Sequence, residues 1–116
     1  MSDTGIFRAV DRPGTDGMVV GTLSLDVLLG DVHSLKEKRG VVRPIVAELR
    51  RRFEVAAAET GDTDLHRRAE IAVAVVSSTH AHATEVLEQC ERLVAARPEI
   101  ELLAARLRVL DDDDLD

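Results

Sequence analysis

Apolar and polar residues alternate with a period of two near the start of the chain, from Met18 to Leu28. One side of this segment carries Val19, Leu23, Leu25 and Val27, and the other carries Thr22, Ser24 and Asp26. A period of two is typical of a β-strand with one buried and one open face. Gly30 and Asp31 interrupt the pattern, so we expect the first strand to end before them.

The next apolar positions have helical spacing: Leu35, Val42, Ile45, Val46, Leu49 and Phe53. Ser34 and Glu37 before them match a capping box, in which a hydroxyl and a carboxylate accept hydrogen bonds from free amides of the first turn. Pro44 lies inside the pattern and has no amide hydrogen. We therefore expect the helix to bend or restart there.

The second half of the chain repeats the strand and helix patterns. We expect a strand over Phe53–Glu59, a turn over Thr60–Asp64 and a third strand over Ala69–Ser77. Ser78 or Thr79 then caps a second helix, and Pro98 ends it. The apolar stripe of this helix is Ala83, Val86, Leu87, Cys90, Leu93 and Val94. The last strand is predicted over Ile100–Leu110.

The order strand, helix, strand, strand, helix, strand predicts an α+β protein with the ferredoxin-like βαββαβ fold. In this fold two helices cover one face of a four-stranded antiparallel sheet. Right-handed crossover connections set the strand order at 4-1-3-2. The opposite face of the sheet is expected to be open.

Composition divides the 116 residues into one domain and two terminal segments. Residues 1–17 lack periodicity, so we expect a flexible, dispensable extension, with Met18 as an alternative translation start. Residues 18–110 form the single domain, and residues 111–116 form a solvated acidic tail with five aspartates. No signal peptide or membrane span is predicted, and one cysteine suits a reducing compartment. We therefore expect a cytoplasmic protein without membrane contact.

The net charge of −7 is unevenly distributed along the chain. Residues 34–52 carry seven lysines and arginines and two glutamates, a local charge of +5. At about 100° per residue, five of these cations fall within a helix sector of about 120°. This basic stripe consists of Lys36, Arg39, Arg43, Arg50 and Arg51.

Such a stripe is a candidate surface for phosphate groups. Alternatively, it is a solvated helix face, or Arg39 or Arg43 pairs with acidic residues of the second helix. Those acidic residues are Glu85, Glu88 and Glu91. The full set of candidate phosphate or RNA contacts is Ser34, Lys36, Lys38, Arg39, Arg43, Arg50, Arg51, Arg67 and Arg68.

The open face of the predicted sheet offers small and apolar side chains: Val20, Thr22, Ala72, Ala74 and Val76. This composition suits a second copy of the chain, a protein partner or a small ligand. Recognition of RNA bases by stacking is not expected there, because residues 18–28 and 69–77 contain no aromatic side chain.

No enzyme or metal-binding pattern is present in the sequence. The four histidines lack the spacing of metal ligands, and Cys90 lies within an apolar stripe, where a buried thiol is inert. There is no nucleophile elbow, phosphate-binding loop or dinucleotide motif. The remaining catalytic alternative is a cluster of Glu59, Asp64, His66 and Arg68. We expect a non-enzymatic protein without a cofactor or a metal.

Three segments resemble the YlxP-like family of small bacterial proteins, a domain of unknown function (DUF503). They are Met18–Leu23, His33–Arg39 and Asp64–Ile71, and the likeness covers about residues 18–110. The resemblance implies a ferredoxin-like fold and supplies no catalytic residue. Genes of this family often lie beside those for translation initiation and ribosome maturation factors, which implies a role related to the ribosome or to RNA.

Two hypotheses follow. The leading one is a non-enzymatic accessory module that docks on ribosomal RNA or a ribosome-assembly intermediate through the basic stripe. The competing one is a homodimeric protein-interaction or small-ligand-binding module that acts through its open sheet face.

Overall fold

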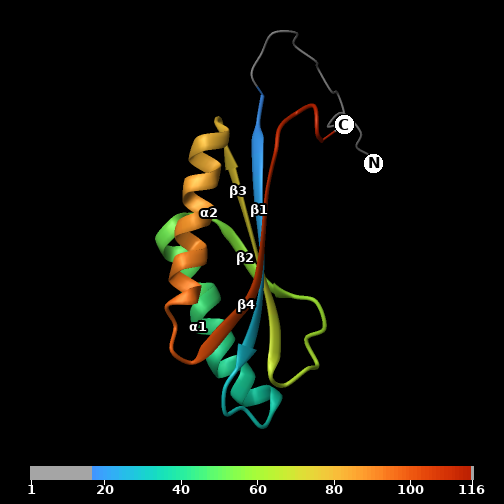
Figure 1. Cartoon of the computed structure of the whole chain (residues 1–116), viewed down its shortest axis with the longest axis vertical. Helices are drawn as coiled ribbons and strands as arrows, with labels where there is room; N and C mark the ends of the chain where they lie inside the picture. The colour runs from blue at the N-terminus through green and yellow to red at the C-terminus, as the bar shows by residue number, and fades with distance from the viewer. Residues whose placement is uncertain (1–16, 116) are drawn as a thin grey trace, which may run out of the picture.

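The computed structural model describes residues 17–115 (Figure 1). Its elements are β1 (Val19–Leu29), α1 (Leu35–Phe53), β2 (Ala56–Thr60), β3 (Arg68–Ser77), α2 (His80–Ala95) and β4 (Ile100–Leu110). All neighbouring strands are antiparallel, and the sheet order is β2-β3-β1-β4. This is the predicted 4-1-3-2 order counted from the opposite edge, so the ferredoxin-like prediction is confirmed.

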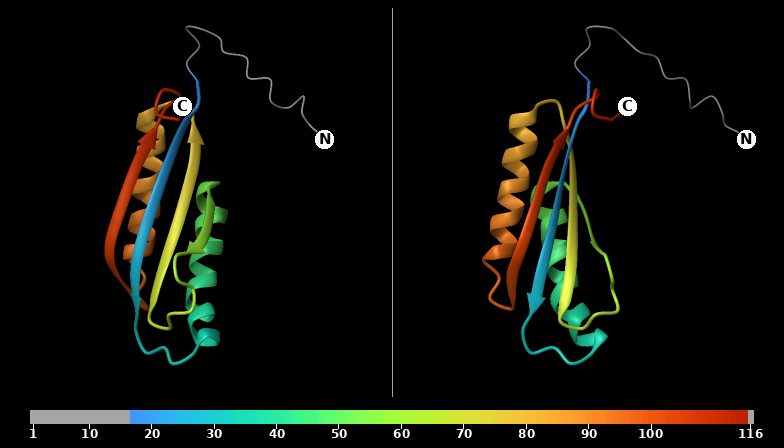
Figure 2. Two further views of the ribbon diagram at one scale, coloured as in Figure 1. Left: turned by 90° about the vertical axis from the view of Figure 1, so that its right-hand side faces the viewer. Right: turned by 45° about the vertical axis from the view of Figure 1, so that its right-hand side comes forward.

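Both helices lie on the same face of the sheet. Figure 2, left, shows the other face toward the viewer, with α1 behind the β2 side and α2 behind the β4 side. The core fills the space between the helices and the sheet. Its fully buried side chains include Leu23, Leu25 and Ile71 from the strands and Ile45, Leu49 and Leu87 from the helices.

A glycine allows α2 to pack closely against the sheet. Gly21 of β1 is buried, and a Cβ at this position would lie 2.7 Å from Leu87 Cδ1 and 3.2 Å from Val75 Cγ1. Contacts this short are closer than carbon atoms normally approach. The missing side chain is therefore a packing requirement of the interface between β1 and α2.

The predicted capping residues are confirmed, but Glu37 accepts from the amide of His33, before the N-cap residue, instead of from an amide of the first turn. The Ser34 hydroxyl accepts from the Glu37 amide at 3.1 Å, and the Glu37 carboxylate accepts from the His33 amide at 2.7 Å. Thr79, one of the two residues predicted to cap α2, accepts from the His82 amide at 3.1 Å. Each cap provides an acceptor for an amide that has no partner within its helix.

Of the two predicted outcomes at Pro44, the restart is wrong, because α1 continues through this residue without interruption, and the bend stays a prediction. Pro44 removes one amide donor, which leaves the Gly40 carbonyl without its helical partner. Gly40 and Pro44 are both exposed, so water can replace the missing donor.

The second strand begins later than predicted. Phe53 is the last residue of α1, and Glu54 then reverses the chain in a left-handed conformation with φ 52° and ψ 45°. As a result β2 starts at Ala56 and has five residues, against ten in β3. The loop of residues 61–67 follows β2 and connects it to β3 (Figure 1).

An irregularity interrupts the pairing of β4 with β1. Asp26 pairs with Ala104 and Val27 pairs with Leu102, so Leu103 has no partner in β1. This arrangement is a β-bulge. Because the side-chain period is two, the bulge changes which residues of β4 share the open face before and after Leu103.

The terminal predictions are only partly within the described structure. Residues 1–16 and 116 lie outside it, so the predicted extension over residues 1–17 stays a prediction. At the other end, residues 111–115 form a turn in which the Asp111 carboxylate accepts from the amides of Asp113 and Asp114. Neither helix within residues 17–115 has the length and hydropathy needed to cross a membrane.

Candidate nucleic-acid interface

Most of the basic stripe is exposed, and its cations have no acidic partner in the described part of the chain. Within residues 17–115, no carboxylate lies within ion-pair distance of Lys36, Arg39, Arg43 or Arg51. The pairing of Arg39 or Arg43 with Glu85, Glu88 or Glu91 is therefore not observed in this part of the chain.

The orientation of α1 about its own axis explains why these ion pairs do not form. The ion pair that links α1 to the segment after α2 involves the other flank of α1, where Glu48 Oε1 lies 3.5 Å from Arg97. Glu48 Oε2 lies 3.5 Å from Arg52 on the same flank. The basic stripe consequently lies on the side of α1 that faces away from α2.

Arg50 connects the basic stripe to the edge of the sheet. Its Nε donates to the Ala57 carbonyl at 3.0 Å, and β2 is an outer strand. The bond fixes the Arg50 end of the stripe along this edge. The other guanidinium nitrogens of Arg50 make no hydrogen bond within the described residues, which leaves them available to an anion.

Lys38 does not belong to a binding surface, and its assignment as an RNA contact is wrong. The side chain is 1% exposed, and Nζ donates to the carbonyls of Thr63 at 3.1 Å and Leu65 at 2.6 Å. The same Nζ lies 2.8 Å from Glu59 Oε2. Lys38 thus holds the loop of residues 61–67 against α1.

Three further candidate contacts are engaged within the protein. Ser34 caps α1, as described above. Arg67 Nε donates to the carbonyls of Leu29 and Gly30 at 3.3 and 3.1 Å. Arg68 makes two hydrogen bonds to Asp26, of 3.3 Å from Nε and 2.5 Å from a terminal nitrogen. These contacts support the strand ends rather than extend the basic stripe.

Two further cations, which were not among the predicted contacts, lie on the open face of the sheet. Arg106 and Arg108 of β4 pair with Ser24 and Thr22 of β1, whose side chains face away from the helices. Both arginines are exposed, and neither has a carboxylate within ion-pair distance among residues 17–115. Their alternation with the half-buried Leu107 could have placed them on this face.

The open face is hollowed into a shallow trough of about 620 Å³. Its floor consists of small side chains: Thr22, Ser24, Ala56, Ala58, Ala72 and Ala74. Arg50 lines the trough at the β2 side, and Arg106 and Arg108 line it at the β4 side. We call this surface the alanine trough. It includes Thr22, Ala72 and Ala74 of the predicted dimer face, whereas Val20 and Val76 pair with each other beyond it.

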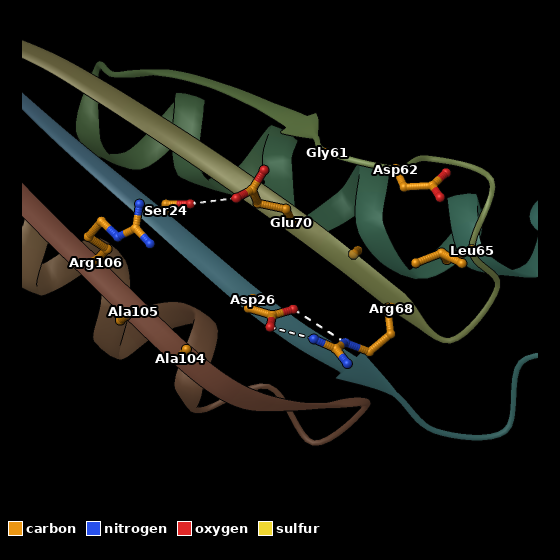
Figure 3. Close-up of a pocket in the computed structure, with 11 residues that line it drawn as sticks. Ser24, Asp26, Gly61, Asp62, Leu65, Arg68, Glu70, Ala104, Ala105 and Arg106 are labelled. Carbon is orange, nitrogen blue, oxygen red and sulfur yellow. Dashed lines mark hydrogen bonds and ion pairs between the residues drawn. The ribbon is translucent and has the colours of Figure 1, made fainter.

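A neighbouring pocket of about 650 Å³ lies beside the loop of residues 61–67 and shares Ser24 and Arg106 with the trough (Figure 3). Glu70 accepts hydrogen bonds of 2.8 Å from both Thr60 and Ser24, and these bonds lower its pKa. Asp26 is paired with Arg68 in the same pocket. The carboxylates of Glu70 and Asp26 are therefore already engaged.

Two residues of the predicted catalytic cluster are engaged in ion pairs. Glu59 is held by Lys38, and Arg68 is held by Asp26, so these two members of the cluster have separate partners.

Cys90 is buried as predicted, and desolvation raises the pKa of its thiol to about 11. Within residues 17–115, no three or more His, Cys, Asp or Glu side chains are grouped to hold a metal ion.

Comparison with known proteins identifies the family. Residues 20–107 match the family described as "Protein of unknown function (DUF503)". The uncharacterized protein YlxP of Bacillus subtilis (strain 168) is 30% identical over 88 residues, which cover 76% of this chain and 96% of that protein. Among solved structures, the de novo designed protein Foldit4 has a TM-score of 0.47 and 14% identity, covering 81% of this chain and 97% of its own. The chain belongs to the DUF503 family, as the resemblance of its motifs implied.

Proposed function

We propose that the protein is a non-catalytic binding module that docks on RNA, in the form of ribosomal RNA or a ribosome-assembly intermediate, through the basic stripe. The observation that supports this function is the absence of acidic partners for Lys36, Arg39, Arg43 and Arg51 within the described residues. Exposed cations on one side of a helix can bind phosphates with release of counterions. An RNA partner of this kind implies a cytoplasmic protein.

The overall negative charge does not oppose local binding to phosphates. Five of the acidic residues lie in residues 111–116, and the described part of this segment follows β4, at the opposite end of the sheet from the start of α1 (Figure 2). Charges farther apart than about 8 to 10 Å are largely screened at physiological salt. We therefore expect binding that depends on the stripe itself and weakens as salt increases.

Reversal of two stripe charges tests the proposal. The variant Arg39→Glu/Arg43→Glu is expected to lose co-sedimentation with ribosomal particles at low salt, because both side chains are exposed and contribute nothing to the core. For a charge-matched control, Arg43→Glu is compared with Arg92→Glu, since Arg92 is an exposed arginine of α2 outside the stripe. Only Arg43→Glu is expected to weaken binding. The proposal is wrong if the unmutated protein co-sediments at no salt concentration.

A second candidate function is homodimerisation through the open face. It is favoured by Val76, a residue that is 67% exposed beside its cross-strand partner Val20. Light scattering of the unmutated chain and of Val76→Glu tests it. A dimer that the substitution dissociates supports this function, and a monomer at every concentration contradicts it.

A further inference from the structure

The basic stripe and the alanine trough share one residue, Arg50. This arginine belongs to the stripe on α1, donates to the Ala57 carbonyl on the outer strand β2, and lines the trough on the open face. Arg106 and Arg108 line the opposite side of the same trough. Cations therefore continue from the helical side of the sheet, around its β2 edge, and onto the open face.

We propose that a single-stranded RNA segment follows this path: along α1, around the β2 edge at Arg50, and across the alanine trough to Arg106 and Arg108. The inference rests on the proposed RNA-binding function and specifies the form and route of the RNA. A duplex is too stiff to bend around one edge of a small sheet, whereas a single strand is flexible. A path that covers two faces of the protein therefore favours single-stranded over duplex RNA.

The chemistry of the alanine trough matches a phosphate backbone. Its lining contains three arginines and no carboxylate. The trough extends from β2 to β4, three strand spacings of about 4.8 Å, so its two sides are about 14 Å apart. The small side chains between them leave room for sugars and bases. Because no aromatic residue lines the trough, bases do not stack on side chains, and we expect little sequence preference.

A second copy of the chain fits the alanine trough less well. Face-to-face packing would bring the same arginines from both copies into one interface. The Asp26 carboxylate is already paired with Arg68, and the charged Glu70 carboxylate acts on Arg106 but not on Arg50 or Arg108, so the offset is incomplete. Burial of cations without partners is costly, so charge favours an anionic occupant.

Fluorescence anisotropy with labelled oligouridine, measured over a range of salt concentrations, tests the route. Each phosphate contact on a single strand contributes about 0.7 to the slope of log affinity against log salt. The variant Arg106→Gln/Arg108→Gln is expected to weaken binding and to reduce this slope by about 1.4. Arg92→Glu, with the same total change in charge, is expected to leave both unchanged. A duplex RNA of equal length is expected to bind the double variant and the unmutated protein equally.

The possible outcomes separate the route from the RNA-binding function itself. If Arg106→Gln/Arg108→Gln binds oligouridine with unchanged affinity and slope while Arg39→Glu/Arg43→Glu does not bind, the route is wrong and RNA binding stands. If the unmutated protein binds no RNA, both are wrong.

Binding of polyglutamate as tightly as oligouridine would overturn the route in favour of an acidic peptide. A dimer that Ala74→Glu dissociates would overturn it in favour of a second copy. Matching thermal unfolding of all variants confirms that they are folded.

Discussion

Lys38 and Glu59 form a buried ion pair that joins α1 to the end of β2. Lys38 Nζ lies 2.8 Å from Glu59 Oε2, and the two side chains are 1% and 20% exposed. The carbonyls of Thr63 and Leu65 accept from the same ammonium group. Two of its donors reach loop carbonyls and the Glu59 carboxylate supplies an opposite charge, so the removal of the ammonium group from water is offset by local contacts.

Substitution of this lysine is expected to be strongly destabilising. Lys38→Met leaves the Glu59 carboxylate and two loop carbonyls without their partner, and it should lower the free energy of unfolding by about 3 kcal/mol. Lys36→Met, at an exposed position of the same helix, should change it by less than about 0.5 kcal/mol. Urea denaturation measures both values. Equal stability of the two variants would show that the buried pair is unimportant.

Two glycine-to-alanine substitutions are expected to have opposite effects. Gly21→Ala places a methyl group against Leu87 and Val75, so it should lower stability by about 1 to 3 kcal/mol. Gly40→Ala adds a methyl group with no atom within 4 Å, inside a helix. Because alanine is the better helix former, it should raise stability by up to about 1 kcal/mol. Thermal unfolding distinguishes the two, and a stabilising Gly21→Ala would contradict the close packing of α2.

The Glu70 carboxylate makes stability depend on pH. The hydrogen bond from Thr60, followed by that from Ser24, lowers its pKa in the folded protein below the ordinary value of 4.5. The stabilisation is therefore complete above the ordinary pKa and is lost as the pH falls through the lowered one. Glu70→Gln should be less stable than the unmutated protein at neutral pH.

This difference in unfolding free energy should narrow in acid. Urea denaturation across the acidic range measures it. Thr60→Val removes the largest cause of the lowered pKa and should weaken the same pH dependence. A difference between Glu70→Gln and the unmutated chain that stays constant down to the lowest pH would refute this assignment.

The thiol of Cys90 is expected to be unreactive in the folded protein. Burial raises its pKa to about 11, so at about pH 8 roughly one thiol in a thousand is ionised, and the thiolate is the reactive form. A disulfide reagent should label Cys90 rapidly in urea and slowly in native buffer. Fast stoichiometric labelling of the native protein would contradict its burial within α2.

The fold was largely predictable because its signals are local. Periods of two and of about 3.6 residues located the strands and helices, and Ser34 and Thr79 marked the helix starts. Phe53 fits both the helical and the strand pattern, and its assignment depends on the left-handed Glu54 that follows it. A single backbone conformation of this kind has no clear signature in the sequence.

The candidate interface was less predictable because burial decides which cations are available. Lys38 precedes the buried Val42 and Ile45 by four and seven residues, a spacing that already places it on the inner side of α1. Its acceptors in residues 59–65 depend on tertiary contacts that no local pattern reveals. Arg106 and Arg108 could not be placed by counting from the buried Ile100, because the bulge at Leu103 changes which β4 residues share the open face.

The Arg50 bond to Ala57 also affects how the molecule meets its neighbours at high concentration. An outer strand offers unpaired backbone groups to which another chain can add a strand, a common route to aggregation. On β2, the Arg50 guanidinium occupies one carbonyl and adds a charge beside it. On β4, the bulge at Leu103 breaks the regular spacing of the exposed backbone groups. Both edges are therefore poor templates for a growing fibril, and the open face can be exposed without exposing a continuous edge.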